Sequence, residues 1–198
     1  MTQQASVVYA VVKVGGGLLG RDDAFERVAG ALAACGGGRP FLVVPGGGPF
    51  AEVVRERSHE LEIAADTAHW MAILGMDQYA HALASRIRGA ALVERHRDIP
   101  VALAAGRIPV LAPYQWLRVA DPLPHSWDVT SDSIAAWLAG AMGAARLILL
   151  KPVAGDPVTL SDPYFARALP PGVECQVVAP GDLTALDRAL RDGRSDER

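Results

Sequence analysis

Lysine occurs at only two positions in this sequence, and both positions suit the chemistry of an anion. Of the 19 basic residues, 17 are arginine, and the exceptions are Lys13 and Lys151. Each lysine follows an apolar run directly, so each is expected at the end of a buried strand. An ammonium group is a compact charge on a flexible stem that can reach a phosphate, whereas a guanidinium is a planar fork. Either lysine alone could reflect chance in an arginine-rich composition, but the pair favours function.

Three runs of three glycines differ in their relation to the predicted elements. The first is Gly15, Gly16 and Gly17, the second occupies positions 36–38, and the third is Gly46, Gly47 and Gly48. The first and third each follow a strand and precede a helix, where glycine lets the backbone approach an anion and the helix start offers N–H groups. We therefore predict two loops at one sheet edge that face the two phosphates of a phosphoryl transfer. Each loop alone would equally suit an ordinary tight turn, and the middle run is predicted to be a helix end.

A cluster of polar residues opens an alanine-rich helix later in the chain. The cluster follows His125 and consists of Thr130, Ser131, Asp132 and Ser133. Side chains of these types cap helix N-termini, which is the simpler explanation. One such residue suffices for a cap, however, and here four occur in succession. We therefore predict that the Asp132 carboxylate holds the two lysine ammonium groups in place without touching substrate.

Short runs rich in β-branched residues alternate along the chain with stretches of helical periodicity. This alternation is typical of βαβ units, and nearly all-apolar strands indicate a sheet covered on both faces. We predict one α/β domain, 1–198, built as a three-layer α/β/α sandwich around a mainly parallel sheet. The strands are predicted at 7–14, 41–44, 91–94, 108–112, 146–150 and 175–179. The helices are predicted at 22–35, 50–61, 64–88, 129–142 and 183–191, with Asp22 and Asp182 as N-terminal caps.

The composition argues against several classes of protein. The chain has 198 residues, 51% of them hydrophobic and 21% charged, so it can bury one sizeable core. A net charge of −3 argues against nucleic acid or an anionic membrane surface as the main partner. The longest stretch without a charged residue, 133–145, is too short to cross a bilayer. Two cysteines without zinc spacing indicate a reducing compartment, so we expect a cytoplasmic protein.

Three motifs, in this order and at these spacings, resemble the amino acid kinase family. They are Val-Lys-Val-Gly-Gly-Gly at 12–17, Val-Pro-Gly-Gly-Gly at 44–48 and Thr-Ser-Asp-Ser at 130–133. Further features are closest to the branch of the family that phosphorylates an aminomethylfuran phosphate in the synthesis of methanofuran-type cofactors. These features are His125-Ser-Trp, the pattern Phe-Ala-x-Val-Val-Arg55, His69 and Met76-Asp77. The resemblance covers nearly the whole chain and is most specific up to Asp132.

The resemblance implies a sheet of about eight strands, with an acceptor half at about 1–120 and a nucleotide half at about 121–192. It implies ATP as donor, Mg²⁺ bridging the nucleotide oxygens with no metal ligands assigned to the protein, a small phosphorylated acceptor and a homo-oligomer. Lys13, Asp132 and Lys151 would be catalytic. The residues expected to bind ATP are Gly15, Gly16, Gly17, Thr130, Ser131 and Gly155. Those expected to bind the acceptor are Gly46, Gly47, Gly48, Arg55, Asp77 and His125.

The nucleotide half departs from the family pattern. Many relatives have Thr-Asp-x-x-Gly where this chain has Lys151-Pro-Val-Ala-Gly155, and several have a second lysine further on, which this chain lacks. Lys151 or Arg167 would then replace that second lysine, or ATP would bind weakly. Two other functions stay open: a non-catalytic anion-binding or regulatory protein of the same fold, and a uridylate-type kinase.

Overall fold

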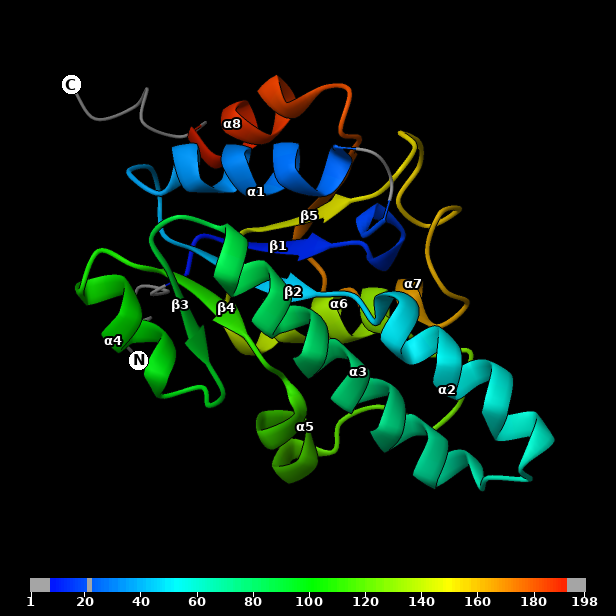
Figure 1. Ribbon diagram of the computed structural model, residues 1–198. Coiled ribbons are helices and arrows are strands. Elements are labelled where there is room, and N and C mark those ends of the chain that lie inside the picture. Colours follow the sequence, from blue (N-terminus) through cyan, green and yellow to red (C-terminus); the bar gives the residue numbers. More distant parts are fainter. Residues whose placement is uncertain (1–7, 21–22, 192–198) are drawn as a thin grey trace.

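The computed structural model describes residues 8–20 and 23–191, and its centre is one parallel sheet (Figure 1). The strands are β1 (Ala10–Val14), β2 (Phe41–Pro45), β3 (Ala90–Val93), β4 (Ile108–Leu111), β5 (Arg146–Leu150) and β6 (Glu174–Val178). Their order across the sheet is β3-β4-β2-β1-β5-β6, and every neighbouring pair is parallel. All six strands overlap the predicted ranges, so the predicted α/β/α architecture is confirmed.

The strand count of about eight, which the family resemblance implied, is wrong for the part of the chain that the structure describes. Residues 151–164, which follow β5, form turns and irregular backbone and add no strand. This stretch contains Pro152, Pro157 and Pro163, and proline lacks the N–H group that a sheet ladder needs. Within the described residues the sheet therefore has six strands, with β6 at one edge.

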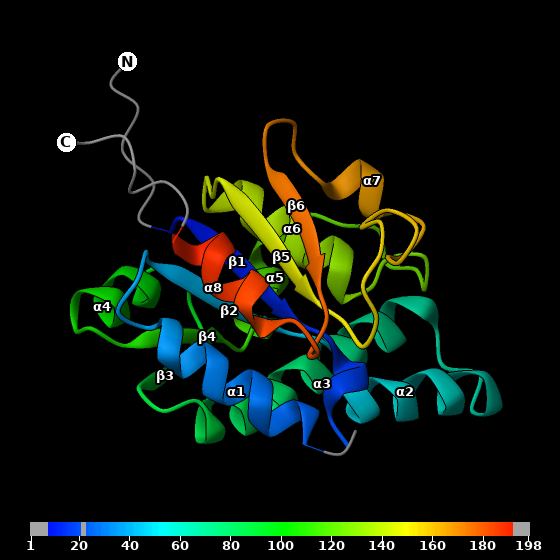
Figure 2. The same ribbon diagram turned by 90° about the horizontal axis from the view of Figure 1, so that it is seen from above.

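Helices cover both faces of the sheet (Figures 1 and 2). The longer ones agree with prediction: α1 (Ala24–Cys35), α2 (Gly48–Glu60), α3 (Ala65–Arg86), α6 (Ser131–Ala141) and α8 (Leu183–Arg191). Sequence reasoning missed the short ones: η1 (Gly16–Leu18), α4 (Asp98–Ala104), α5 (Tyr114–Ala120) and α7 (Phe165–Ala168). Asp182 accepts a hydrogen bond from the Ala185 backbone N–H, which confirms its cap, whereas Asp22 lies outside the described residues. None of the described helices combines the length and apolar character needed to cross a membrane.

Two apolar clusters fill the spaces on either side of the sheet, and they decide where the lysines point. Val12 packs into the cluster with α1 and α8, while Val11 packs into the cluster with α6. Because side chains alternate along a strand, Lys13 lies on the α6 side, and its register partner Leu149 belongs to the cluster on that side. Lys151, two residues beyond Leu149, extends toward the same side.

The order of the strands places both lysines at a switch point. From β1 the chain continues to β2 on one side of the sheet, and from β5 it continues to β6 on the other. Connections that diverge in this way leave a crevice at the carboxyl ends of the strands, where α/β proteins bind ligands. Lys13 lies near the end of β1, and Lys151 directly follows β5.

Candidate active site

Asp132 bridges the two lysines at the carboxyl ends of β1 and β5. Its Oδ1 lies 2.8 Å from the Lys13 Nζ atom, and its Oδ2 accepts a 2.6 Å hydrogen bond from the Lys151 Nζ atom. The Lys151 Nζ atom also donates to the backbone carbonyl of Leu160 at 2.7 Å. Lys13 is only 4% exposed and Asp132 6%, so solvent ions screen their contact little. The three residues predicted to be catalytic thus lie together.

The charge state of Asp132 follows from its two partners. Burial raises the pKa of Asp132, but the nearby charges and hydrogen bonds of Lys13 and Lys151 outweigh burial and hold that pKa below its usual range. The carboxyl group is therefore ionised at neutral pH. Two ammonium groups and one carboxylate leave one net positive charge, which suits the stabilisation of developing phosphoryl charge.

The two glycine loops contact each other beside Lys13. A Cβ atom on Gly16 would overlap the backbone nitrogen of Gly48, and a Cβ atom on Gly46 would lie 2.7 Å from the backbone nitrogen of Gly16. Gly48 also has a φ of +56°, in the left-handed region that favours glycine. Gly16 begins η1 and Gly48 begins α2, so both lie where N–H groups have no acceptor within their own helix.

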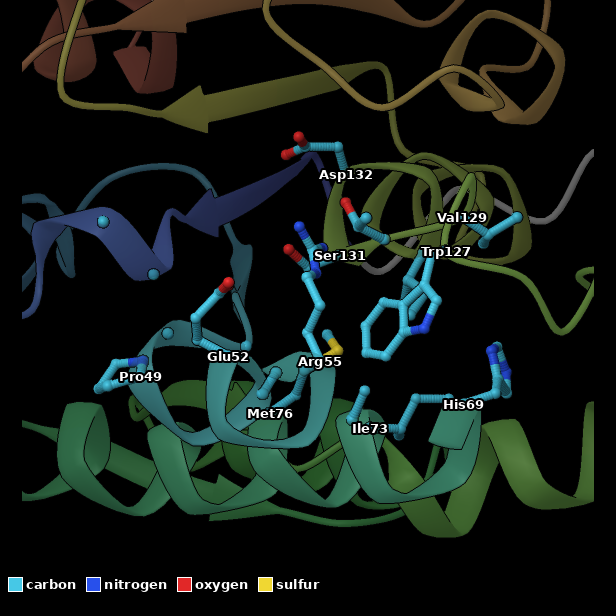
Figure 3. Close-up of a pocket in the computed structure, with 18 of the residues that line it drawn as sticks. Pro49, Glu52, Arg55, His69, Ile73, Met76, Trp127, Val129, Ser131 and Asp132 are labelled. Carbon is cyan, nitrogen blue, oxygen red and sulfur yellow. The ribbon is translucent and has the colours of Figure 1, made fainter. Parts of the chain in front are cut away.

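A cavity of about 470 Å³ lies between these loops, α2, α3 and the start of α6 (Figure 3). Nine predicted site residues line it: Lys13, Gly16, Gly17, Gly47, Gly48, Arg55, Thr130, Ser131 and Asp132. Ile73, Met76 and Trp127 give the cavity an apolar wall, and Figure 3 shows Glu52 and Arg55 rising into it from α2. The cavity therefore has one wall suited to binding an anion and one apolar wall.

Three glycines predicted to belong to the site lie outside the cavity lining. The Gly15 backbone N–H donates to the Leu150 carbonyl, and that of Gly46 donates to the Val14 carbonyl, both at 2.8 Å. These two glycines join the ends of neighbouring strands. Gly155 is exposed and lies beside the Leu160 side chain, outside the cavity lining.

Asp77 also lies outside the cavity lining and has a partner in the fold. Its Oδ1 accepts a 3.0 Å hydrogen bond from the Tyr114 backbone N–H, at the start of α5. Burial raises the pKa of Asp77 to about 6, although this hydrogen bond acts in the opposite direction. The structure thus uses Asp77 to join α3 to α5, and its contact with an acceptor stays a prediction.

His125 does not line the cavity but stacks on a histidine that does. One ring nitrogen contacts Asp66 and the other contacts Asp121, so neither nitrogen faces the cavity. The His125 ring stacks on His69, which does line the cavity. Sequence reasoning noted His69 only as part of a resemblance.

Arg167 and Lys151, the two candidates for the missing second lysine, lie in different surroundings. Arg167 is exposed on α7, with its guanidinium 6.0 Å from the Tyr164 ring, and it does not line the cavity. Lys151 contacts Asp132. The geometry therefore favours Lys151.

Asp162 is a residue of this site that sequence reasoning missed. It accepts hydrogen bonds from the backbone N–H groups of Thr130 and Ser133, at 3.0 and 3.1 Å, and from both of their hydroxyl groups. It thereby caps α6, whose first turn carries Asp132. The cap comes from 29 residues beyond Ser133, so no local pattern indicated it.

A model of the amino acid kinase family matches residues 9–155. The (5-(aminomethyl)furan-3-yl)methyl phosphate kinase of Methanocaldococcus jannaschii is 29% identical over 117 residues, which cover 59% of this chain and 54% of that protein. The match thus spans about half the length of that relative.

Solved structures share the fold at low sequence identity. The uridylate kinase of Archaeoglobus fulgidus superposes with a TM-score of 0.69 at 16% identity, covering 93% of this chain and 97% of that one. A UMP kinase of Bacillus anthracis gives 0.65 at 16% identity, with 91% of each chain covered. The family model covers well over half of the sequence and includes both glycine loops, Asp132 and Lys151. On this ground the chain belongs to the amino acid kinase family.

Proposed function

We propose that this protein is an ATP-dependent kinase whose acceptor is a small phosphate monoester. The preferred acceptor is (5-(aminomethyl)furan-3-yl)methyl phosphate, called the aminomethylfuran phosphate below, and the product is its diphosphate. The observation that carries the proposal is the Lys13–Asp132–Lys151 bridge beside two glycine loops in contact. Membership of the family and the name of the Methanocaldococcus jannaschii relative support it.

In the proposed reaction, an oxygen of the acceptor phosphate attacks the γ-phosphorus of ATP. The bond from that phosphorus to the β–γ bridging oxygen breaks, and ADP leaves with the electron pair. Such a reaction asks a protein chiefly for positioning and charge neutralisation. Lys13, which lines the cavity, neutralises charge on the transferred group. Asp132 and Lys151 hold Lys13 in place from behind.

Each of the two glycine loops binds a different phosphate group. Gly16 and Gly17 bind the donor phosphates, and Gly47 and Gly48 bind the acceptor phosphate. Because the backbones of Gly16 and Gly48 touch, the two anions are held next to each other. Mg²⁺ bound to ATP would supply further neutralisation of phosphate charge.

The apolar wall of the cavity suits the ring of the proposed acceptor. Ile73 and Met76 project from α3, and Trp127 faces them in the view of Figure 3. A flat five-membered ring can pack against such side chains while its phosphate reaches the glycine loops. A cavity of this size is typical of sites for small molecules.

An assay of ADP release over three conditions tests the proposal: the aminomethylfuran phosphate, UMP, and no acceptor. We expect a diphosphate product by phosphorus NMR, with a kcat/KM for the furan at least about tenfold above that for UMP. Asp132→Asn should lower the rate strongly. Asp23→Asn is the matched control, because Asp23 is exposed and pairs with Arg27 on α1. A preference for UMP would indicate a uridylate-type kinase, and no turnover with either acceptor would favour a binding protein.

A further inference from the structure

We propose that the end of the cavity beside His69 binds a primary ammonium group of the acceptor, and that His125, Asp66 and Asp121 position His69 for this contact. The inference rests on the proposed function, because it concerns the same acceptor. It adds a residue that discriminates between small phosphate monoesters with and without an ammonium group.

His69 is held in one orientation by aromatic neighbours. Its ring stacks on His125 with the ring centroids 4.2 Å apart and the planes inclined by 18°. The ring of Trp70 meets it edge-on at 4.9 Å. His69 is half-buried, lines the cavity and lies on α3 toward the end of the cavity occupied by Trp127 (Figure 3). A fixed imidazole thus forms part of the cavity wall where the acceptor is proposed to bind.

His125 cannot contact a ligand through its ring nitrogens, because both already have partners. Its Nδ1 atom contacts the Asp66 carboxylate, and its Nε2 atom lies 2.7 Å from an Asp121 oxygen. An imidazole flanked by two carboxylates is suited to the doubly protonated form, which donates at both nitrogens. Although partial burial lowers the pKa of His125, the hydrogen bonds and charges of Asp121 and Asp66 raise it above its ordinary value overall.

The same arrangement keeps His69 neutral. Burial and the neighbouring charge of His125 lower the pKa of His69 to about 4, despite the opposing effect of Asp121 and Asp66. At neutral pH His69 therefore offers one N–H group and one unprotonated nitrogen. That nitrogen can accept a hydrogen bond from a cationic donor.

The unprotonated His69 nitrogen favours a cationic hydrogen-bond donor. Behind the ring, the Asp66 and Asp121 carboxylates flank the His125 imidazolium, and the Arg118 guanidinium lies 4.6 Å from the Trp70 ring. These charges balance, so the preference rests on the nitrogen itself. The phosphate end of the cavity has the opposite character, because Gly47 and Gly48 line it and offer backbone N–H groups at the start of α2. A ligand with a phosphate at one end and an ammonium at the other matches both ends. The des-amino analogue, with a methyl group in place of the aminomethyl group, would leave the half-buried His69 nitrogen unpaired.

Calorimetry without nucleotide can test this with two probes, the aminomethylfuran phosphate and its des-amino analogue. We expect wild-type protein to bind the amine at least about tenfold more tightly. His69→Leu should reduce this preference to less than about twofold while leaving the affinity for the des-amino analogue nearly unchanged. His81→Asn, an exposed position on the same helix outside the cavity lining, is the control and should keep the full preference.

The pH profile separates a positioning role of His125 from a merely structural one. In wild-type protein the preference for the amine should persist to about pH 5 and fail below it, when His69 takes up a proton. In His125→Asn the cationic neighbour is gone, so His69 should protonate at a higher pH and the preference should fail there. An unchanged profile would contradict the role of His125.

Parallel phosphorylation assays keep the two proposals apart. Equal affinity of wild-type protein for both probes, with both phosphorylated, would overturn the ammonium site and leave the kinase proposal standing. Failure of both probes to bind and to be phosphorylated would overturn both proposals. Preference for the amine without phosphorylation would support the site and contradict the kinase.

Discussion

Lys13 and Lys151 look alike in the sequence but have different surroundings in the structure. Both contact Asp132, yet only Lys13 lines the cavity, while Lys151 donates a second hydrogen bond to the Leu160 carbonyl. For the proposed reaction, this asymmetry favours Lys13 for direct contact with the transferred group. Lys151 would then act through Asp132, as a charge that keeps the carboxylate in place.

Lys13→Ala should lower kcat several hundredfold and leave the affinity for the acceptor almost unchanged. Loss of one group that stabilises transition-state charge costs roughly 3–4 kcal/mol. Because Lys151 acts through the same carboxylate, the double variant Lys13→Ala/Lys151→Ala should be little slower than Lys13→Ala. Steady-state kinetics and acceptor titrations check both expectations. Losses that multiply in the double variant would show that Lys151 contacts the phosphates independently.

Acid should destabilise the protein through His69. The pKa of His69 is lowered to about 4 in the folded protein, mainly by burial, so between pH 6.5 and 4 the unfolded chain takes up a proton that the folded protein does not. The stability due to a neutral His69 is therefore complete above pH 6.5 and is lost as pH falls. We expect the free energy of unfolding of wild-type protein, relative to His69→Asn, to decline from pH 7 to 4.5. Urea titrations measure it, and a difference independent of pH would contradict the burial of His69.

At the scale of elements, the sequence was most informative where each signal was local. The strands β1, β2 and β5 could be predicted because each consists mainly of an apolar run with a charged residue, a proline or a glycine loop at its end. The helices α4, α5 and α7 could not, because they have only four to seven residues and show too few turns for a periodic pattern. The positions of Lys13 and Lys151 at one edge of the sheet were predictable for the same reason as the strands that carry them.

Contacts between distant segments could not be predicted. Asp77 is predicted to contact the acceptor, and its hydrogen bond to the start of α5, 37 residues away, is a further role that the sequence did not indicate. Asp162 was not singled out, although it caps α6 from outside the helix. Neither contact produces a recognisable pattern in the local sequence. Both depend on how the sheet brings loops together.

Asp162→Ala should loosen the start of α6 and lower kcat more than it weakens acceptor binding. Loss of a helix cap costs about 1–2 kcal/mol, and here Asp132 lies in the first turn that the cap holds. Denaturant unfolding and steady-state kinetics measure the two effects. Asp156→Ala is the matched control, since Asp156 accepts similar hydrogen bonds from Thr159 in an exposed turn. Equal effects of the two changes would show that Asp162 has no special relation to the site.

Gly16→Ala should disrupt both phosphate loops at once. The new methyl group would overlap the Gly48 backbone, so the loops would have to separate, and donor and acceptor affinity should both fall. Gly37→Ala is the control, because a Cβ atom there meets nothing within 4 Å. Calorimetric titrations with an ATP analogue and with the acceptor measure the two affinities. A loss confined to one ligand would mean that the loops work independently.

At the scale of the whole molecule, the cavity joins the two predicted halves of the chain. Gly47 and His69 come from the first 120 residues, and Trp127 and Asp132 come from the rest. The division into acceptor and nucleotide halves stays a prediction. Since both halves contribute strands to one sheet, neither has a separate sheet of its own. The site therefore depends on the sheet as a unit.

The surface of α2 and α3 leads to a prediction about association. These helices pack on each other, and around them Leu61 is 67% exposed and Leu74 42% exposed. Large apolar side chains exposed on neighbouring elements favour an interface, and two copies that pair about a twofold axis use the same surface from each. We therefore expect the 20.9 kDa chain to form a homodimer through α2 and α3, with a mass in light scattering of about 42 kDa.

Leu74→Glu should shift the protein to monomer, because it places a charge in that interface. Val101→Glu should not, because Val101 is 68% exposed on α4, which packs against β3 and β4. A monomeric wild-type protein at micromolar concentration, or equal dissociation by both substitutions, would show that this surface has no partner of its own kind.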